Sequence, residues 1–272
     1  MTTLKETTKK TSVWNGRINL NFRIKGQGPA LVYFHPAAGL AWDPFLDKLS
    51  ERFTIHAPEF PGTTPGDPYA IHQVDDLADA VFFYEEAIRQ MGLVGSIAVG
   101  QSFGGMLAIE LSAAFPDLFS KLIVLDPIGL WRDEAPVANW MTASAQELPA
   151  MLFKDPMRPA AQALLAMPEE PEAAVVATAQ LIWNYGATGK MVWPIPDRGM
   201  KKRLHRVKTP SLIVWGENDA MIASSYAHEL ARQIKGSQVE IVADCGHIPQ
   251  VEQSLTTFRL VSGFLGTTQE TA

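Results

Sequence analysis

A serine flanked by glycines lies at residues 100–105, which read Gly-Gln-Ser-Phe-Gly-Gly and centre on Ser102. The short apolar run before it, 96–99, is typical of a strand, and the apolar run after it, 106–115, lacks Gly and Pro and is typical of a helix. A sharp strand-to-helix turn would hold Ser102 in a strained conformation, and the flanking glycines would let neighbouring chain pass close by. We therefore expect Ser102 to be presented as a nucleophile at the end of a strand.

A serine hydroxyl attacks at neutral pH only when a base takes its proton and a third group orients that base. Three histidines follow Ser102 in the chain, namely His205, His228 and His247. We expect His205 to be solvated in a basic stretch and His228 to lie on the outer face of a helix. His247 follows a β-branched run at 238–242, so it can reach across the end of a sheet. His247 is the predicted base.

Two aspartates at predicted strand ends could orient this base. Asp219 follows a buried-strand pattern at 211–215, and Asp126 follows another at 121–125. Either one could instead be an ordinary loop or capping carboxylate. The motif favours Asp219 as the acid and leaves Asp126 as the alternative, while Glu217 is a weaker candidate because it starts nearer its strand.

Short apolar runs alternate with helical patterns along the chain. The runs lie near residues 31–34, 53–57, 96–99, 121–125, 211–215 and 238–242, and helical spacing appears at 74–91 and 255–265. This alternation predicts a parallel sheet covered by helices on both faces. Ligands bind such sheets at the carboxyl ends of the strands, where the predicted serine, aspartate and histidine all fall.

The first residues of the chain carry a separate signal. Asn15-Gly16, between two β-prone stretches, predicts a type I′ hairpin turn, and the alternation at 17–22 predicts an edge strand. Residues 1–12 are polar and lack the apolar segment of a secretory signal, so we expect a frayed tail there.

Together these motifs resemble the α/β-hydrolase superfamily, in which nucleophile, acid and base follow in the order Ser102, Asp219, His247. Four further stretches carry the resemblance. Residues 35–39 are similar to the His-Gly-x-x-Gly oxyanion loop, with Pro36 replacing Gly, and residues 59–62 are similar to the Asp-x-Pro-Gly loop, with Glu59 replacing Asp. Residues 216–219 are similar to the Gly-x-x-Asp acid loop, and residues 246–247 to the Gly-His that carries the base. The resemblance covers nearly the whole chain. It implies an α/β-hydrolase fold, with a mostly parallel eight-stranded sheet, helices on both faces and a helical cap insertion.

The resemblance also implies an oxyanion hole made of two backbone N–H groups. One belongs to Phe103, the residue after the nucleophile, at a helix N-terminus whose dipole favours negative charge. The other belongs to Ala37. Pro36 lacks an N–H, but the family pattern does not use the N–H at that position.

Residues 128–200 contain no convincing strand but show Pro-punctuated helical pieces at 137–153, 159–167 and 171–185. The resemblance implies that residues 129–200 form the helical cap, inserted between the core segments 1–128 and 201–272.

Bulky apolar residues in this segment imply an apolar substrate pocket. The candidate pocket residues are Trp140, Trp183 and Trp193, although packing against the core is the alternative for each of them. Arg132 and Arg158 could bind an anionic group, with solvated surface as the alternative.

Composition narrows the functional classes. A chain of 272 residues with 47% apolar content can bury a large core, and a net charge of −6 gives no electrostatic footprint for nucleic acid. The single cysteine, Cys245, excludes an internal disulfide, fits a reducing compartment and is expected to be structural. No run of 18 apolar residues predicts a membrane span. We expect a cytoplasmic protein without cofactor or metal, and the oligomeric state stays open.

These observations predict a serine hydrolase that cleaves an ester, thioester or lactone of a small apolar carbonyl compound through an acyl-enzyme on Ser102. A second hypothesis is a C–C bond hydrolase, because residues 245–252 are similar to those of aromatic ring-cleavage pathways, although Ile248 stands where they usually carry an aromatic residue. A cofactor-free perhydrolase is a variation on the same site. A ligand receptor or scaffold with a vestigial site is the hypothesis from another class.

Overall fold

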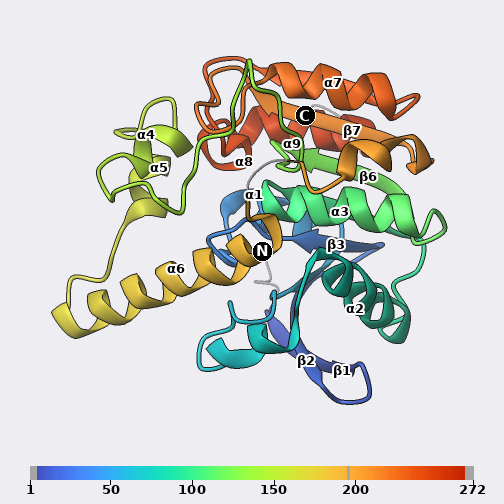
Figure 1. The fold of residues 1–272 in the computed structure, drawn as a ribbon, viewed down its shortest axis with the longest axis horizontal. Helices are drawn as coiled ribbons and strands as arrows, with labels where there is room; N and C mark the ends of the chain where they lie inside the picture. Colours follow the sequence, from blue (N-terminus) through green and yellow to red (C-terminus); the bar gives the residue numbers. More distant parts are fainter. Residues whose placement is uncertain (1–4, 195–196, 267–272) are drawn as a thin grey trace.

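The computed structural model describes residues 5–194 and 197–266, and its centre is one twisted sheet (Figure 1). The strands are β1 (Thr7–Val13), β2 (Ile18–Gly26), β3 (Ala30–Phe34), β4 (Thr54–Pro58), β5 (Ser96–Gln101), β6 (Phe119–Leu125), β7 (Ser211–Gly216) and β8 (Gln238–Val242). They form an eight-stranded sheet in the order β1-β2-β4-β3-β5-β6-β7-β8. The first two pairings, β1 with β2 and β2 with β4, are antiparallel, and the remaining pairings are parallel. The predicted mostly parallel sheet is therefore confirmed.

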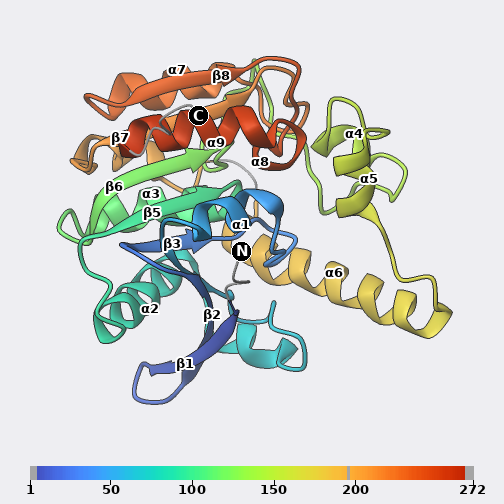
Figure 2. The same ribbon diagram turned by 180° about the vertical axis from the view of Figure 1, so that it is seen from behind.

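Helices cover both faces of this sheet, as predicted. The helices that flank it are α1 (Pro44–Ser50), α2 (Leu77–Gln90), α3 (Phe103–Ala114), α7 (Ser225–Gln233), α8 (Pro249–Glu252) and α9 (Ser254–Leu265). Helices α2, α3 and α7 pack on one face, whereas α1 and α9 pack on the other, as the opposite views in Figures 1 and 2 show. Because side chains alternate along a strand, Val32 and Phe34 of β3 join one buried core while Leu31 and Tyr33 join the other. The sheet is thus held rigidly from both sides.

The N-terminal hairpin begins earlier than predicted. Residues 7–13 pair with β2 along their whole length, so the frayed tail predicted for 1–12 is wrong for the strand residues, and residues 1–4 lie outside the described part of the chain. The threonines of this stretch favour extended chain, and backbone pairing supplies the rest. Strand β1 is consequently the edge strand, and β2 lies between β1 and β4.

The turn of this hairpin is wider than a two-residue type I′ loop. Strand pairing ends at Val13 and Ile18, so four residues connect the strands. Trp14 and Asn15 both have φ of +53°, and the N–H of Gly16 donates to Val13 O at 3.2 Å. Arg17 N also donates to Trp14 O at 3.2 Å across Asn15 and Gly16, and Gly16 has φ of +86°, so the predicted Asn-Gly turn is present and a second turn overlaps it one residue earlier.

A helical segment separates β6 from β7. It contains α4 (Leu148–Leu152), α5 (Pro159–Leu165) and α6 (Pro171–Val192), followed by 3₁₀ turns at Met200–Lys202 and Leu204–Arg206; a further 3₁₀ turn, Pro68–Gln73, precedes α2. In Figure 1 these three helices lie to one side of the sheet, and α6 projects outward. The boundaries of a cap at 129 and 200 stay a prediction.

The first helical piece predicted in this segment, 137–153, is largely irregular. Ser144 and Glu147 exchange hydrogen bonds as in a capping box, with Ser144 N donating to Glu147 Oε2 at 2.9 Å and Glu147 N donating to Ser144 Oγ at 3.2 Å. Helix α4 therefore forms only after this box.

No helix among the described residues is long and apolar enough to cross a bilayer.

Candidate active site

Ser102 occupies a strained turn between β5 and α3. Its backbone has φ of +52° and ψ of −113°, which a non-glycine residue rarely adopts. A Cβ at Gly104 would lie 2.1 Å from Phe34 O, and a Cβ at Gly100 would lie 2.4 Å from Gly104 O. The end of β3 thus passes against the turn at a distance that only glycine permits, as the sequence predicted.

Three side chains from distant segments meet at this turn. His247 Nε2 lies 2.9 Å from Ser102 Oγ, and His247 Nδ1 lies 2.7 Å from Asp219 Oδ2. All three residues are buried. Because a carboxylate only accepts, Nδ1 carries the ring proton and donates it, which leaves the lone pair of Nε2 facing the serine hydroxyl. This is the tautomer that a general base for Ser102 needs.

The loop after β7 fixes the carboxylate of Asp219. Its Oδ1 accepts hydrogen bonds from the backbone N–H groups of Met221 at 2.8 Å and Ile222 at 2.9 Å. Its Oδ2 accepts from Trp215 Nε1 at 3.2 Å in addition to the imidazole. The acid is therefore oriented before any substrate arrives.

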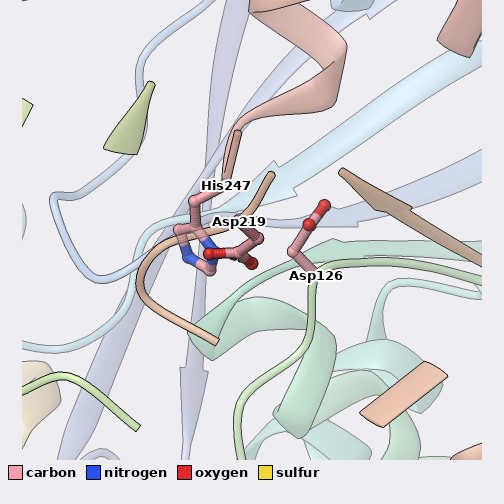
Figure 3. Close-up of side chains that lie close together, drawn as sticks. All are labelled: Asp126, Asp219 and His247. Atoms are coloured by element: carbon pink, nitrogen blue, oxygen red, sulfur yellow. Dashed lines mark hydrogen bonds and ion pairs between the residues drawn. The ribbon is translucent and has the colours of Figure 1, made fainter. Parts of the chain in front are cut away.

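Asp126, the alternative acid, lies beside this pair. It follows β6 with φ of +45°, and its Oδ1 accepts from Gly216 N at 2.9 Å. Figure 3 shows Asp219 against the imidazole ring of His247 and Asp126 on the other side of Asp219. The geometry therefore assigns the imidazole to Asp219, as the motif favoured. The weaker candidate, Glu217, is exposed and accepts from Asp244 N at 3.4 Å.

The other titratable residues considered as catalytic candidates take no part in the hydrogen bonds between Ser102, His247 and Asp219. His205 and His228 are exposed, as predicted, and His228 belongs to α7. Cys245 is fully buried, and burial raises the pKa of its thiol. Cys245 is therefore a protonated packing residue rather than a nucleophile.

Ala37 and Phe103 present the two N–H groups predicted for the oxyanion hole. Phe103 begins α3, and Ala37 lies in the turn after β3. Within the part of the chain that the structure describes, neither N–H has a hydrogen-bond acceptor. Both groups are consequently available to a substrate oxygen.

His35 fixes the turn that carries Ala37. Its Nδ1 donates to Pro36 O at 2.7 Å, and its Nε2 accepts from Phe60 N at 2.9 Å. Burial lowers the pKa of His35 to about 4, so the ring is neutral at neutral pH and keeps this tautomer. The sequence predicted His35 only as part of a motif and missed this supporting role.

Helix α6 supports the same turn from the opposite side. Asn184 Nδ2 donates to Ala38 O at 2.7 Å, and Thr188 Oγ1 donates to Ala37 O at 3.2 Å. Sequence reasoning missed both residues, because no local motif links α6 to a loop almost 150 residues earlier.

Two further residues support the base. Gln101 Nε2 donates to His247 O at 2.9 Å, and its position next to Ser102 could have suggested this contact. Glu252, whose side chain is fully buried, accepts from Gly246 N at 2.6 Å and from Lys154 N at 3.2 Å. The loop that carries His247 is thus tied both to the serine turn and to the segment before α5.

A cavity of about 410 Å³ opens over Ser102 and His247. Its apolar lining comes mainly from the helical segment and the histidine loop: Trp140, Leu148, Leu152, Leu164, Leu165, Met167, Leu181, Met221, Ile248 and Val251. Trp140 therefore lies where the sequence predicted. Trp183 and Trp193 do not line the cavity, because the Trp183 indole donates to Pro68 O at 2.9 Å and Trp193 is 53% exposed.

The charged groups of the cavity are few. Arg23 is the one cation among its described lining residues, and its guanidinium binds Glu6 at 2.6 and 2.9 Å. Asp43 and Glu59 also line the cavity, and burial raises the pKa of Asp43 to about 7.

The other two candidate cations face away from the cavity. Arg158 pairs with Asp244 at 2.5 Å, and Arg132 Nη2 donates to Ser225 Oγ at 2.6 Å. Neither of them is a lining residue.

One group of possible metal ligands comes together among the described residues. It consists of Asp126, Asp219 and His247, with one ligand atom from each within 4.8 Å of the others. Both oxygens of Asp219 and the Nδ1 of His247 are already engaged in hydrogen bonds with protein groups. A bound cation would have to displace these bonds, so the donor set fits a hydrogen-bonded relay better than a metal centre.

Comparison with known proteins places the chain in a family. Residues 31–259 match the alpha/beta hydrolase family, so the chain belongs to that family and is a hydrolase of the α/β class. A 2-(acetamidomethylene)succinate hydrolase from Mesorhizobium japonicum is 26% identical over 267 residues, covering 92% of each chain. A 2-hydroxy-6-oxo-6-phenylhexa-2,4-dienoate hydrolase from Burkholderia cepacia is 24% identical, covering 97% of this chain and 99% of its own.

The solved structures agree on the fold. Naproxen esterase from Bacillus subtilis superimposes with a TM-score of 0.75 at 17% identity, covering 97% of this chain and 92% of that one. The α/β-hydrolase fold predicted from the motifs is therefore confirmed. Esterases and C–C bond hydrolases both occur among the similar proteins, so the family alone leaves the bond that is cleaved unassigned.

Proposed function

We propose that this protein is a serine hydrolase that cleaves a carboxylic ester, thioester or lactone through an acyl-enzyme on Ser102. One observation carries the proposal: the continuous path from Asp219 Oδ2 through His247 to Ser102 Oγ, with steps of 2.7 and 2.9 Å. Such distances are those of hydrogen bonds already formed, so proton transfer requires no rearrangement of the site.

The proposed reaction proceeds in two halves. Nε2 of His247 takes the hydroxyl proton as Ser102 Oγ attacks the carbonyl carbon, and Asp219 stabilises the resulting imidazolium. The imidazolium then gives this proton to the leaving alcohol or thiol as the carbonyl–heteroatom bond breaks. In the second half, His247 takes a proton from water, hydroxide attacks the acyl group, and the proton returns to Ser102 as the acid leaves.

The negative charge that develops on the carbonyl oxygen needs two donors. In the proposal these are the N–H groups of Ala37 and Phe103, which lack acceptors among the described residues. The helix dipole of α3 adds to the field at Phe103. Losing one such donor costs on the order of a hundredfold in rate.

The charges in the cavity favour a neutral substrate. Arg23 is already paired with Glu6, whereas Glu59 contributes negative charge to the same walls. A substrate carboxylate would be desolvated there without a free cation, which costs several kcal/mol. We therefore propose an uncharged apolar acyl group, held by the leucines and methionines of the lining.

A second candidate is cleavage of a C–C bond in a dienol-ketone. The similarity to the Burkholderia cepacia hydrolase favours it, and the same serine, histidine and aspartate would serve. The substrates in the names of both relatives, a dienoate and a succinate, are carboxylates, and the absence of an unpaired cation among the described lining residues counts against them here. Ile248 beside the base also departs from the pattern of that class.

The helical segment at 129–200 is proposed to act as a cap over the site. Its α4, α5 and α6 contribute much of the apolar lining, and α6 holds the turn of Ala37 through the hydrogen bond from Asn184 to Ala38 O. Excluding water strengthens every electrostatic contact with the transition state and protects the acyl-enzyme.

One experiment separates these functions. The purified protein would be assayed on p-nitrophenyl esters of increasing acyl length, on thioesters, on lactones and on a yellow dienol-ketone acid. We expect turnover of neutral esters that Ser102→Ala abolishes, with labelling of the wild type by a fluorophosphonate. The control Ser237→Ala changes a serine at the start of β8, at the opposite end of that strand from His247, and should remain active.

Three results would overturn the ester proposal. Turnover of the dienol-ketone alone would establish the C–C hydrolase. Labelling of Ser102 without turnover of any substrate class would favour a receptor. Undiminished ester hydrolysis by Ser102→Ala would exclude the assigned nucleophile.

A further inference from the structure

Asp126 is a buried acid that the mechanism above does not use. It is 0% exposed, and its backbone adopts φ of +45°. Its Oδ1 accepts one hydrogen bond, from Gly216 N at 2.9 Å. Its Oδ2 is buried and receives no hydrogen bond from any described residue. An ionised carboxylate would leave this oxygen uncompensated in the interior.

A second carboxyl group lies next to this oxygen. One side-chain ligand atom from each of Asp126, Asp219 and His247 lies within 4.8 Å of the others, and Figure 3 shows Asp126 and Asp219 as neighbouring side chains. Two negative charges this close in a buried site repel strongly, so the pair shares one charge and one proton. The proton must therefore reside on one of the two aspartates.

The hydrogen bonds decide which aspartate keeps the charge. Asp219 accepts from two backbone N–H groups, from Trp215 and from His247, whereas Asp126 accepts from one backbone N–H. Donors stabilise the ionised form, so the charge belongs on Asp219. The single indole N–H of Trp215 is shared, because it donates to Ile222 O at 2.9 Å and to Asp219 Oδ2 at 3.2 Å. The carboxylate of Asp219 can therefore accept one further hydrogen bond.

We propose that Asp126 is a positioning residue that is protonated at neutral pH and donates a hydrogen bond from its Oδ2–H to the carboxylate of Asp219. The inference rests on the proposed role of Asp219 as the acid of a catalytic triad. Asp126 touches neither substrate nor the reacting atoms, and it acts through Asp219.

The electrostatics of the pocket agree with this assignment. Burial raises the pKa of Asp126 well above its usual value, and the charge of the neighbouring Asp219 raises it further. The titratable neighbours that face this pair are His247 and Cys245 from the loop after β8, with Glu252 of α8 beside the cysteine. The fixed cation near this group is Arg158, which lies 3.7 Å from Glu252 and pairs with Asp244 at 2.5 Å, so its charge is already offset by these carboxylates.

A protonated Asp126 has a consequence for the base. One negative charge beside the imidazole stabilises the imidazolium that forms during attack. A second negative charge would favour the imidazolium over the neutral ring, and a protonated ring cannot accept the serine proton. The proton on Asp126 therefore keeps His247 competent.

Two substitutions test the proposal through activity. Asp126→Asn keeps the shape and offers an N–H in place of the O–H, so kcat/KM should stay within about threefold of the wild type with an unchanged acidic limb of the pH profile. Asp126→Leu removes the donor and should lower kcat about tenfold, with KM nearly constant. A downward shift of the acidic limb by about one pH unit in Asp126→Asn would overturn the proposal, because it would reveal a lost negative charge.

An infrared difference spectrum tests it without any substrate. Wild type minus Asp126→Asn at neutral pH should contain the C=O stretch of a protonated carboxylic acid. The matched control Asp76→Asn, at an exposed helix cap, should contain only carboxylate bands. A carboxylate band in place of the acid band at position 126 would overturn the proposal, whereas failure of the ester assay alone would count against the proposed function and not against this proton.

Discussion

His247 and Ser102 lie 145 positions apart in the chain, yet their side chains meet at 2.9 Å. The strands that lead to them are not neighbours, since β6 and β7 lie between β5 and β8. Three strand spacings amount to about 14 Å, which a loop at the end of β8 must cross. Gln101 holds the far end of that loop by donating to His247 O, and Glu252 holds its middle through Gly246 N. In the proposed mechanism, activity therefore depends on the position of this loop as much as on the three side chains.

The first prediction concerns Asp219. Asp219→Asn can present an N–H to the ring and favours the wrong imidazole tautomer, so kcat should fall about ten-thousandfold while the protein still folds. Steady-state kinetics on the best ester measure this loss. The exposed neighbour Asn218 provides the control, and Asn218→Ala should retain near-normal activity. A kcat within tenfold of wild type in Asp219→Asn would show that another group orients His247.

Gly104 gives a prediction about the serine turn. In Gly104→Ala the new methyl would lie 2.1 Å from Phe34 O and 2.6 Å from His35 O, so the end of β3 must move away from the turn. Displacing the oxyanion N–H groups in this way should cost at least about a hundredfold in kcat. Unfolding monitored by circular dichroism should also show a lower Tm than the wild type.

The control for that change is Gly263, a helical glycine of α9 whose added Cβ would meet nothing within 4 Å. Gly263→Ala should leave kcat unchanged and raise stability by about 0.5–1 kcal/mol. An unchanged kcat and a raised stability in Gly104→Ala, as expected for Gly263→Ala, would show that the close approach of Phe34 O does not constrain position 104.

Sequence reasoning found the parts of this site that depend on local pattern. The strands at 238–242 and 211–215 were located almost to the residue, because β-branched runs bounded by turns are a local signal. The serine turn was found for the same reason, since Ser102 needs glycines at fixed offsets.

The sequence did not predict how α6 docks against the loops of the core. Trp183 and Asn184 are adjacent on α6, yet one donates to Pro68 O and the other to Ala38 O, and only the docking of the helix decides which side faces the cavity. The strand at Thr7–Val13 was mistaken for a tail because edge strands with exposed polar side chains lack an apolar signature.

The third prediction uses the raised pKa of Asp43. Its folded-state pKa of about 7 lies above the unfolded value of 3.8, so its protonated form contributes stability that is complete below pH 4 and is lost as the pH rises through 7. Asp43→Asn keeps an acceptor for Leu46 N but cannot ionise. Its Tm should match that of the wild type near pH 4 and exceed it at pH 8. At pH 8 the free energy of unfolding should be larger than that of the wild type by an amount on the order of 1–3 kcal/mol.

Asp76 offers the matched control for this titration. It caps α2 through the N–H of Asp79 just as Asp43 caps α1, but it is exposed. Asp76→Asn should give a stability difference from the wild type that does not grow between pH 4 and pH 8. If the stability difference between variant and wild type increased equally from pH 4 to pH 8 in Asp43→Asn and Asp76→Asn, its cause would be helix capping and not the burial of Asp43.

The last prediction concerns Glu252, whose buried carboxylate accepts from Gly246 N at 2.6 Å, Lys154 N at 3.2 Å and Asp155 N at 3.0 Å. Glu252→Gln replaces one acceptor oxygen by an NH₂ group that faces a backbone N–H, so two donors would meet without an acceptor. The free energy of unfolding should therefore fall by about 2–3 kcal/mol. Because Gly246 precedes the base, kcat should also fall about tenfold or more from misplacement of His247. Denaturant titration and ester kinetics measure the two effects, with Glu169→Gln at an exposed position as the control. If stability drops while kcat is preserved, the carboxylate serves the fold alone, and the loop finds its catalytic position through Gln101.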